Sequence, residues 1–186
     1  MYNQIERELK QLLQKEQYEK LRKSYDFPVC IHQTNTYYDT DDQLLKNMSG
    51  ALRLRTIDNK TIFTLKIRQD AITLTELEKE ITGNTLDDAF KDLQIQKWLK
   101  QYKIPTKVHP IANFSTVRYL KKLEKGELCL DQTNFGSKID YECEYEYTCN
   151  HDGIQIFNEI LKPIGIKYKK NGPSKLARAI KFSNNK

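Results

Sequence analysis

The feature that most restricts the fold of this chain is a set of short segments in which apolar and charged side chains alternate. Side chains of a β-strand point to opposite faces in turn, so each such segment predicts a strand with one apolar and one charged face. Together with a β-branched and aromatic stretch at 30–40, the segments are 4–10, 51–57, 60–68, 73–82, 108–122, 127–134 and 138–149. Roughly eight antiparallel strands can close into a small barrel. We therefore expect an α+β protein built on an eight-stranded antiparallel β-barrel.

Helical spacing of apolar residues appears between these strands. It predicts a helix at 15–25, a short helical turn between 40 and 50, a helix that follows Asp152 and a last helix at 174–181. The longest predicted helix runs from residue 86 to about residue 102, with a box-like cap formed by Thr85 and Asp88. The Asp58-Asn59 pair predicts a tight turn that joins two strands as a hairpin.

Composition sets the class of protein. The 186 residues, 38% of them hydrophobic, suit a single domain over 1–186 with a real core. No apolar run approaches the ~18 residues of a membrane-spanning helix, and the N-terminus has no signal-peptide core, so we expect a cytoplasmic protein without a membrane partner. The four cysteines have no metal-binding spacing and are expected to stay reduced, and the three histidines have no recognisable catalytic partner. A net charge of +6 favours anionic partners.

The charges on the strand faces are segregated by sign. Two neighbouring strands carry only basic residues on their polar faces, whereas others carry rows of glutamates at 76–80 and 142–146. On a solvated surface the signs are normally mixed, because like charges two residues apart repel each other. For one pair alone, such as Arg53 and Arg55, a solvated face remains an equal alternative. The whole set predicts two facing walls, one for anions and one for cations.

Phosphoanhydride chemistry with a divalent metal requires both walls. Mg²⁺ and Mn²⁺ prefer carboxylate and phosphate oxygens. Arg and Lys match the non-bridging oxygens of phosphate. A triphosphate carries about four negative charges, so several cations are needed to desolvate it.

The same residues resemble the CYTH superfamily, which is named for adenylate cyclase and thiamine triphosphatase and is also called the triphosphate tunnel metalloenzymes. The first motif, Glu6-x-Glu8-x-Lys10, is similar to the ExExK signature of that family. NTYYDT followed by LRLR is similar to a bacterial subgroup often described as adenylate cyclases. Further motifs follow in the family order: LRLR at 52–55, FTLK at 63–66, ELE at 76–78, TVRY at 116–119, LCLD at 128–131, YECEYE at 141–146 and PSKLAR at 173–178.

The resemblance implies a barrel whose interior is a hydrophilic tunnel. It implies a substrate-binding set of Lys10, Arg53, Arg55, Lys66, Arg118, Lys175 and Arg178. It also implies a metal-binding set, for Mg²⁺ or Mn²⁺, of Glu6, Glu8, Glu76, Glu78, Asp131, Glu142 and Glu144. Catalysis would rest on Lys10, Arg53, Arg55, Lys66, Arg118 and Asp131. One position departs from the pattern, since Thr116 stands where some members have a basic residue.

Several alternatives stay open at this point. Glu78 and Glu80 could replace Glu76 and Glu78, and four acidic residues alternate at Asp140, Glu142, Glu144 and Glu146. The implied activity is metal-dependent hydrolysis of a small-molecule triphosphate or polyphosphate, which releases orthophosphate. An adenylate cyclase and a non-catalytic polyphosphate or nucleotide receptor are the rivals. A nucleic-acid partner is not expected, because the carboxylates would repel a long phosphate backbone. The substrate, the preferred metal and the oligomeric state do not follow from these patterns.

Overall fold

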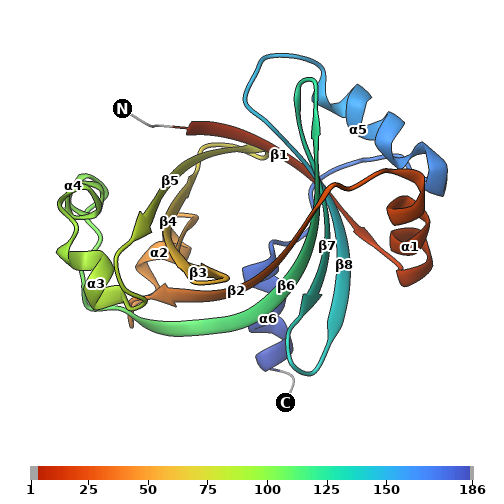
Figure 1. Ribbon diagram of the computed structural model, residues 1–186. Helices are drawn as coiled ribbons and strands as arrows, with labels where there is room; N and C mark the ends of the chain where they lie inside the picture. Colours follow the sequence, from red (N-terminus) through yellow and green to blue (C-terminus); the bar gives the residue numbers. More distant parts are fainter. Residues whose placement is uncertain (1–3, 185–186) are drawn as a thin grey trace.

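The computed structural model describes residues 4–184, which form a closed antiparallel β-barrel (Figure 1). Around the barrel the strands follow the order β1-β5-β4-β3-β2-β6-β7-β8, and β8 pairs with β1 to close the ring. The strands within residues 4–184 are β1 (Gln4–Leu13), β2 (Val29–Asp39), β3 (Gly50–Ile57), β4 (Lys60–Arg68), β5 (Thr73–Ile81), β6 (His109–Leu123), β7 (Gly126–Asn134) and β8 (Ile139–Tyr147). This architecture confirms the predicted fold.

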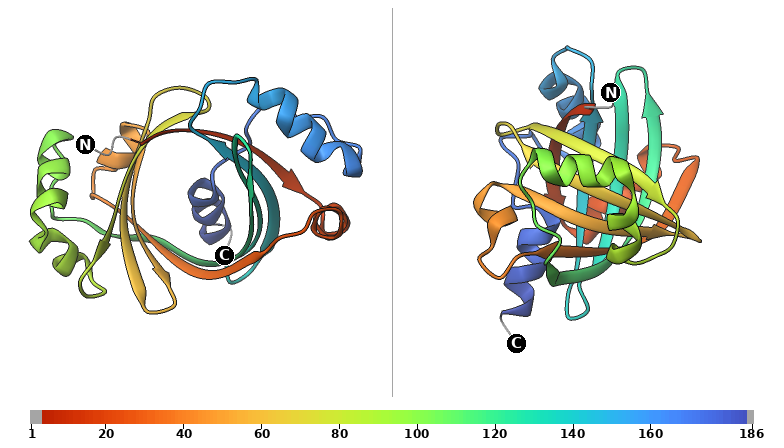
Figure 2. Two further views of the ribbon diagram at one scale, coloured as in Figure 1. Left: turned by 45° about the horizontal axis from the view of Figure 1, so that its top comes forward. Right: turned by 90° about the vertical axis from the view of Figure 1, so that its left-hand side faces the viewer.

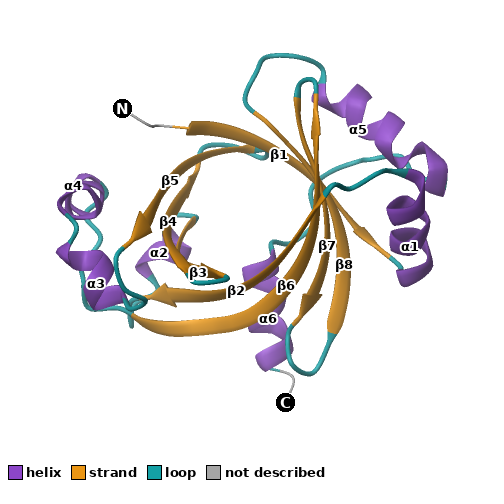
Figure 3. Cartoon of the chain, viewed as in Figure 1, coloured by secondary structure: helices purple, strands orange, loops and turns teal. Residues whose placement is uncertain are grey.

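Helices lie in the connections between the strands and in the segment that follows β8, as Figure 3 shows by colour. In the described part of the chain they are α1 (Lys15–Ser24), α2 (Leu44–Asn47), α3 (Leu86–Lys91), α4 (Leu93–Gln101), α5 (Gly153–Leu161), the 3₁₀ turn η1 (Lys162–Ile164) and α6 (Lys175–Ser183). Within residues 4–184, none of them combines the length and the apolar character that crossing a bilayer requires.

The single long helix predicted from residue 86 to about residue 102 is wrong, because α3 and α4 are separate helices. The break lies at Asp92, whose backbone is extended with φ −75° and ψ 124°. Its side chain accepts hydrogen bonds from the backbone N–H groups of Gln94 and Ile95, and it therefore caps a new helix. The predicted cap at Thr85 and Asp88 is present at the start of α3.

The apolar faces of the strands point out of the barrel, where the helices cover them. Leu9 and Tyr145 are buried in one outer cluster with Tyr18 of α1 and Phe157 of α5. A second outer cluster joins β3, β4 and β5 to α2, α3 and α4, and its members include Leu45, Leu65, Leu77 and Leu99. Figure 1 shows α1 and α5 on one side of the barrel and α3 and α4 on the opposite side. The interior is consequently left to the polar faces.

Helix α6 differs from the others in its position. Viewed along the barrel it lies inside the outline of the strands, and in the side view it extends beyond one end (Figure 2). Ser174 caps the helix through the N–H of Ala177. Because Lys175 on the first turn of α6 contacts interior residues of β7 and β8, the beginning of the helix reaches into the barrel.

Candidate functional site

The interior of the barrel holds a cavity of about 1310 Å³. Both predicted walls line it. The predicted site residues among its lining are Glu6, Glu8, Lys10, Arg53, Arg55, Lys66, Glu76, Glu78, Arg118, Glu144 and Lys175. They come from six strands and from α6, and the strands that contribute more than one, β1, β3 and β5, present them at every second position.

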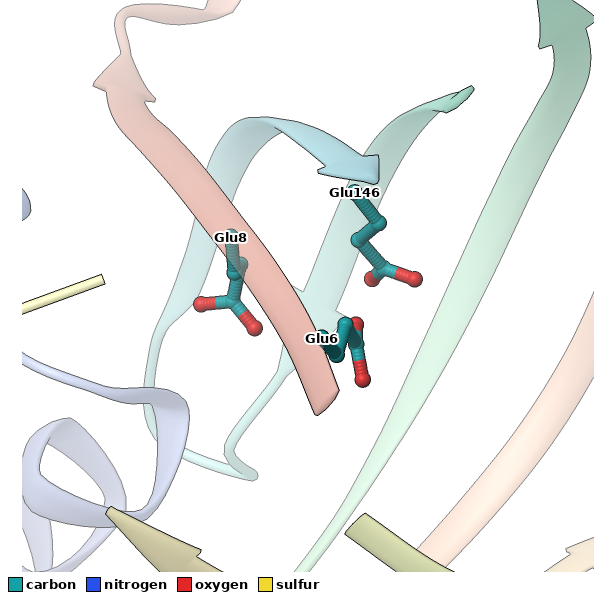
Figure 4. Close-up of side chains that lie close together, drawn as sticks. All are labelled: Glu6, Glu8 and Glu146. Carbon is teal, nitrogen blue, oxygen red and sulfur yellow. The ribbon is translucent and has the colours of Figure 1, made fainter. Parts of the chain in front are cut away.

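Three carboxylates converge at one place in this tunnel. Figure 4 shows Glu6 and Glu8 on β1 and Glu146 on the neighbouring strand β8. One carboxylate oxygen from each side chain lies within 4.8 Å of the other two. The pairing of Glu8 with Glu146 across the two strands produces this convergence. Three hard oxygen donors at this spacing fit a divalent cation such as Mg²⁺ or Mn²⁺.

The electrostatics of this group fit a cation as well. Burial, with the nearby charges of Glu146 and Glu76, raises the pKa of Glu6 to about 11, although the charge of Lys66 opposes the shift. Burial also raises the pKa of Glu146, against the opposing charge of Arg118. The protein's own basic groups therefore compensate these carboxylates only in part.

The cations of β3 and β4 face the carboxylates of β5. Lys66 Nζ lies 2.6 Å from Glu76 Oε2 and 4.0 Å from Glu6 Oε2. Arg53 Nη2 lies 3.0 Å from Glu78 Oε1 and 3.6 Å from Glu76 Oε1. Burial opposes ionisation of Glu76, but the charges of Lys66 and Arg53 hold the pKa of its carboxyl well below the usual range.

Two arginines retain hydrogen-bonding capacity that the described residues do not use. The buried Nε–H of Arg53 has no acceptor within residues 4–184. Arg55 Nε donates to Asn35 Oδ1 at 3.0 Å, and no carboxylate of the described chain lies within ion-pair distance of its guanidinium. Burial and the charges of Arg53 and Arg118 lower the pKa of Arg55 to about 10. An anion bound in the tunnel would accept the unused hydrogen bond of Arg53 and would compensate the charge of Arg55.

The opposite side of the interior is a dense ion-pair network. Arg118 holds Asp131 through two hydrogen bonds of 2.8 Å and also contacts Glu144 and Glu146. Lys175 Nζ lies 2.6 Å from carboxylate oxygens of Glu142 and Glu144 and 2.9 Å from Asp131 Oδ2. Burial opposes the charge of Lys175, but these three carboxylates hold its pKa well above the usual range.

Three predicted site residues do not line the cavity, namely Asp131, Glu142 and Arg178. Arg178 lies 2.7 Å from Asp140 Oδ2 and 3.1 Å from Glu142 Oε1, and Asp131 is fully buried beneath Arg118 and Lys175. Contact of these three with substrate or metal stays a prediction. In this structure Asp131 pairs with Arg118 and Lys175, whereas Glu142 pairs with Lys175 and Arg178.

The structure also places the residues that the sequence left open. Glu76 and Glu78 both line the cavity, the first buried and the second 40% exposed. Glu80 is not among the lining residues and is exposed, paired with Lys60 at 3.0 Å. On β8, Glu144 and Glu146 line the cavity. Glu146 was on the predicted charged face but was not assigned to the metal set. The unbroken alternation at 140–146 was the signal for it.

Two further tunnel residues were assigned no role from the sequence, although both lie in the NTYYDT stretch that carries part of the family resemblance. The ring of Tyr37 lies 6.0 Å from the guanidinium carbon of Arg53 and stacks on Phe114 with a centroid distance of 5.5 Å. Asn35 is the hydrogen-bond partner of Arg55. Both lie on β2, whose mixed composition carried no charge pattern. Cys143, which alternates with Glu142 and Glu144 along β8, is buried in the outer cluster with Leu9 and Tyr145.

Comparison with known proteins identifies the class that this barrel and its charged interior define. The model of the CYTH domain matches residues 4–180, and the chain belongs to the CYTH domain family. This membership confirms the resemblance drawn from the ordered motifs.

Individual relatives cover almost the whole chain. The Bacillus subtilis (strain 168) protein named "Putative triphosphatase YjbK" is 29% identical over 171 residues, which are 89% of this chain and 90% of that protein. A crystal structure described as a "putative adenylate cyclase" from Bacillus halodurans is 31% identical, with a TM-score of 0.82 over 96% of this chain and 98% of that one. HpAC1 from Hippeastrum, described as a "putative adenylyl cyclase" that "reveals a dominant triphophatase activity", is 23% identical, with a TM-score of 0.77 over 96% of this chain and 95% of that one.

Proposed function

We propose that this protein is a divalent-metal-dependent hydrolase of small molecules that carry a triphosphate chain, and that it releases orthophosphate. The observation that carries the proposal is the tunnel, in which three convergent carboxylates share one cavity with arginines whose hydrogen-bonding capacity is unused. The name of the Bacillus subtilis relative, "Putative triphosphatase YjbK", supports the proposal. We expect the enzyme to act in the cytoplasm as one domain over residues 1–186.

In this proposal the basic side chains bind the phosphates. Arg53 and Arg55 donate to phosphate oxygens with the groups that the protein leaves unpaired. Lys10, Lys66 and Arg118 extend the row of cations and already balance neighbouring carboxylates. Several fixed cations that hold the chain of phosphates orient the terminal phosphorus for attack by water and stabilise the charge of the transition state.

Glu6, Glu8 and Glu146 are the residues that we assign to Mg²⁺ or Mn²⁺. An ion held by these carboxylates would supply positive charge that offsets the charge of the phosphate oxygens and polarises the reacting phosphorus. Glu8 also accepts a hydrogen bond from Lys10 Nζ, so the carboxylate and the adjacent cation are held together. Glu144 belongs to the acidic wall of the tunnel, and its charge holds Arg118 and Lys175 in place beside the phosphate site.

The experiment measures phosphate release from inorganic triphosphate, thiamine triphosphate, ATP and a short polyphosphate, with and without Mg²⁺ or Mn²⁺. We expect metal-dependent orthophosphate release by the wild type and its loss in the variants Glu8→Gln and Glu144→Gln. Glu80→Gln is the matched control, because Glu80 lies on the same strand face as Glu76 but at the exposed rim. The control should retain full activity.

Three outcomes contradict the proposal. Full activity of both the Glu8 and Glu144 variants removes the assigned site. Accumulation of cAMP and pyrophosphate from ATP, in place of orthophosphate, identifies a cyclase. Tight binding of the same anions without turnover under any metal condition identifies a receptor for phosphate chains.

A further inference from the structure

Strand β1 changes its neighbours along its length. It pairs with β5 over residues 4–7 and with β8 over residues 7–13. Beyond residue 7 the edge of β1 that faced β5 has no strand partner in the described part of the chain. Backbone N–H and C=O groups in such a position need other hydrogen-bond partners. This gap lies beside Glu8 and Lys10, whose side chains line the tunnel.

One side chain fills the gap. Asn171, in the segment between η1 and α6, donates from Nδ2 to the backbone oxygen of Glu8 at 2.7 Å. Its Oδ1 accepts from the backbone N–H of Lys10 at 2.8 Å. The N–H of Glu8 donates to the backbone oxygen of Ile72 at 2.9 Å, where β5 is about to begin. The carboxamide of Asn171 therefore continues the hydrogen-bond ladder where β5 leaves it.

The chemistry of the carboxamide explains the fit. Residues two apart on a strand direct their backbone groups to the same edge, so the C=O of Glu8 and the N–H of Lys10 are neighbours on one side of β1. A primary amide offers one acceptor oxygen and a donor nitrogen in one plane, as a peptide group does. A carboxylate in the same place could accept from the N–H of Lys10 but could not donate to the C=O of Glu8.

Further contacts hold Asn171 itself in place. The hydroxyl of Tyr168 donates to Asn171 Oδ1 at 3.0 Å, and Tyr168 packs on Phe157 of the outer cluster. Asn171 Nδ2 is also 3.4 Å from the backbone oxygen of Ala71 in the turn before β5. Four residues after Asn171, Lys175 enters the ion-pair network of the interior.

We propose that Asn171 is a positioning residue for the tunnel. It fixes the backbone of β1 between Glu8 and Lys10 and so sets the place at which the carboxylate and the ammonium group enter the cavity. The inference rests on the proposed function in so far as Glu8 binds metal and Lys10 binds phosphate. The hydrogen bonds that Asn171 makes to β1 do not depend on that function.

The first test compares the Mn²⁺ affinity of the wild type, Asn171→Ala and Asn158→Ala by calorimetric titration of the full chain with Mn²⁺ alone. Asn158 is the matched control, because its Oδ1 accepts the N–H of Tyr168 at 2.9 Å and so holds the same segment, with no side-chain hydrogen bond to β1 in the described part of the chain. Loss of a residue that orients a metal ligand typically costs about 10- to 100-fold in metal affinity, and we expect a loss in this range for Asn171→Ala. The control should bind Mn²⁺ within about twofold of the wild type, because the ladder at β1 is intact.

A second measurement, amide hydrogen exchange, separates this inference from the proposed function. In Asn171→Ala the amide of Lys10 should exchange faster, whereas those of Leu9 and Gln11, which pair with β8, should keep their protection. Unchanged exchange at Lys10, unchanged Mn²⁺ affinity in Asn171→Ala, or an equal loss of affinity in Asn158→Ala each overturns the positioning role. A wild type that binds no Mn²⁺ counts against the proposed function, and the exchange at Lys10 then decides the role of Asn171 alone.

Discussion

Replacing Lys175 by methionine tests whether this residue is primarily a counter-ion of the acidic wall. Its ammonium group contacts Asp131, Glu142 and Glu144, all of which are nearly inaccessible to solvent. Methionine keeps most of the apolar stem and removes the charge. Removing one partner of a buried ion pair costs about 3–5 kcal/mol, because the remaining charge is left uncompensated. For a chain of this size that loss lowers the Tm by roughly 6–20 °C.

The effect should depend on pH with a defined sign. Burial disfavours the carboxylate of Glu144, but Lys175, Arg118 and Lys10 hold its pKa well below the usual value of 4.5. A carboxyl group with a lowered pKa contributes stability above its unfolded-state pKa and loses that contribution as the pH falls. Without Lys175 the pKa of Glu144 rises, so part of the contribution is already lost at neutral pH. The difference between wild type and variant should therefore shrink between about pH 7 and about pH 4.

The assay is equilibrium unfolding in urea, followed by circular dichroism in the presence of EDTA at both pH values. Lys181→Met is the matched control, because Lys181 lies on the same helix but is exposed to solvent. Its free energy of unfolding should stay within about 0.5 kcal/mol of the wild type. The reasoning is refuted if Lys175→Met loses less than about 1 kcal/mol at pH 7, or if its deficit persists unchanged at pH 4.

Three other substitutions probe separate parts of the molecule. Arg55→Met should raise the KM for inorganic triphosphate by about tenfold or more, with little change in the free energy of unfolding. The reason is that Arg55 has one hydrogen bond, to Asn35, and no ion pair within the described residues. A strong loss of stability with an unchanged KM would contradict this. Asp92→Ala should destabilise the chain by about 1 kcal/mol in urea unfolding, since the cap of α4 is lost, and an unchanged midpoint would show that the cap is dispensable. Phe63→Ala should cost about 3–5 kcal/mol in the same assay, because Phe63 is fully buried in an outer cluster, and a loss below about 1 kcal/mol would disprove that packing.

The barrel was predictable because its signal is local. Alternation within each strand reports which side chains share a face, and the resulting faces at Arg53, Lys66 and Glu144 all line the tunnel. The break at Asp92 was not predicted, because apolar residues at helical spacing continue from Leu86 to Trp98 on both sides of it. Only the capping bonds of Asp92 to the following backbone reveal the new helix.

Which charged residues lie opposite one another along the tunnel was harder to predict than which side chains share a strand face. Whether Glu142 or Glu146 meets Glu6 and Glu8 depends on the register between β1 and β8, and a pattern within one strand does not encode the register between two. The family motif favoured Glu142, whereas the register brings Glu146 opposite Glu8. Asn171 carried no signal, because it lies in a segment without periodicity and its partners are backbone atoms.

The closure of the barrel by β1 and β8 also bears on when the site can form during synthesis. Glu6 and Glu8 leave the ribosome well before Glu146 and the strand that carries it. Pairing between such distant segments carries a large loop-closure entropy and forms late in folding. A nascent chain therefore has no complete group of three carboxylates until nearly all of its strands are made. If this group binds a metal as we propose, binding is thereby deferred until the barrel has closed.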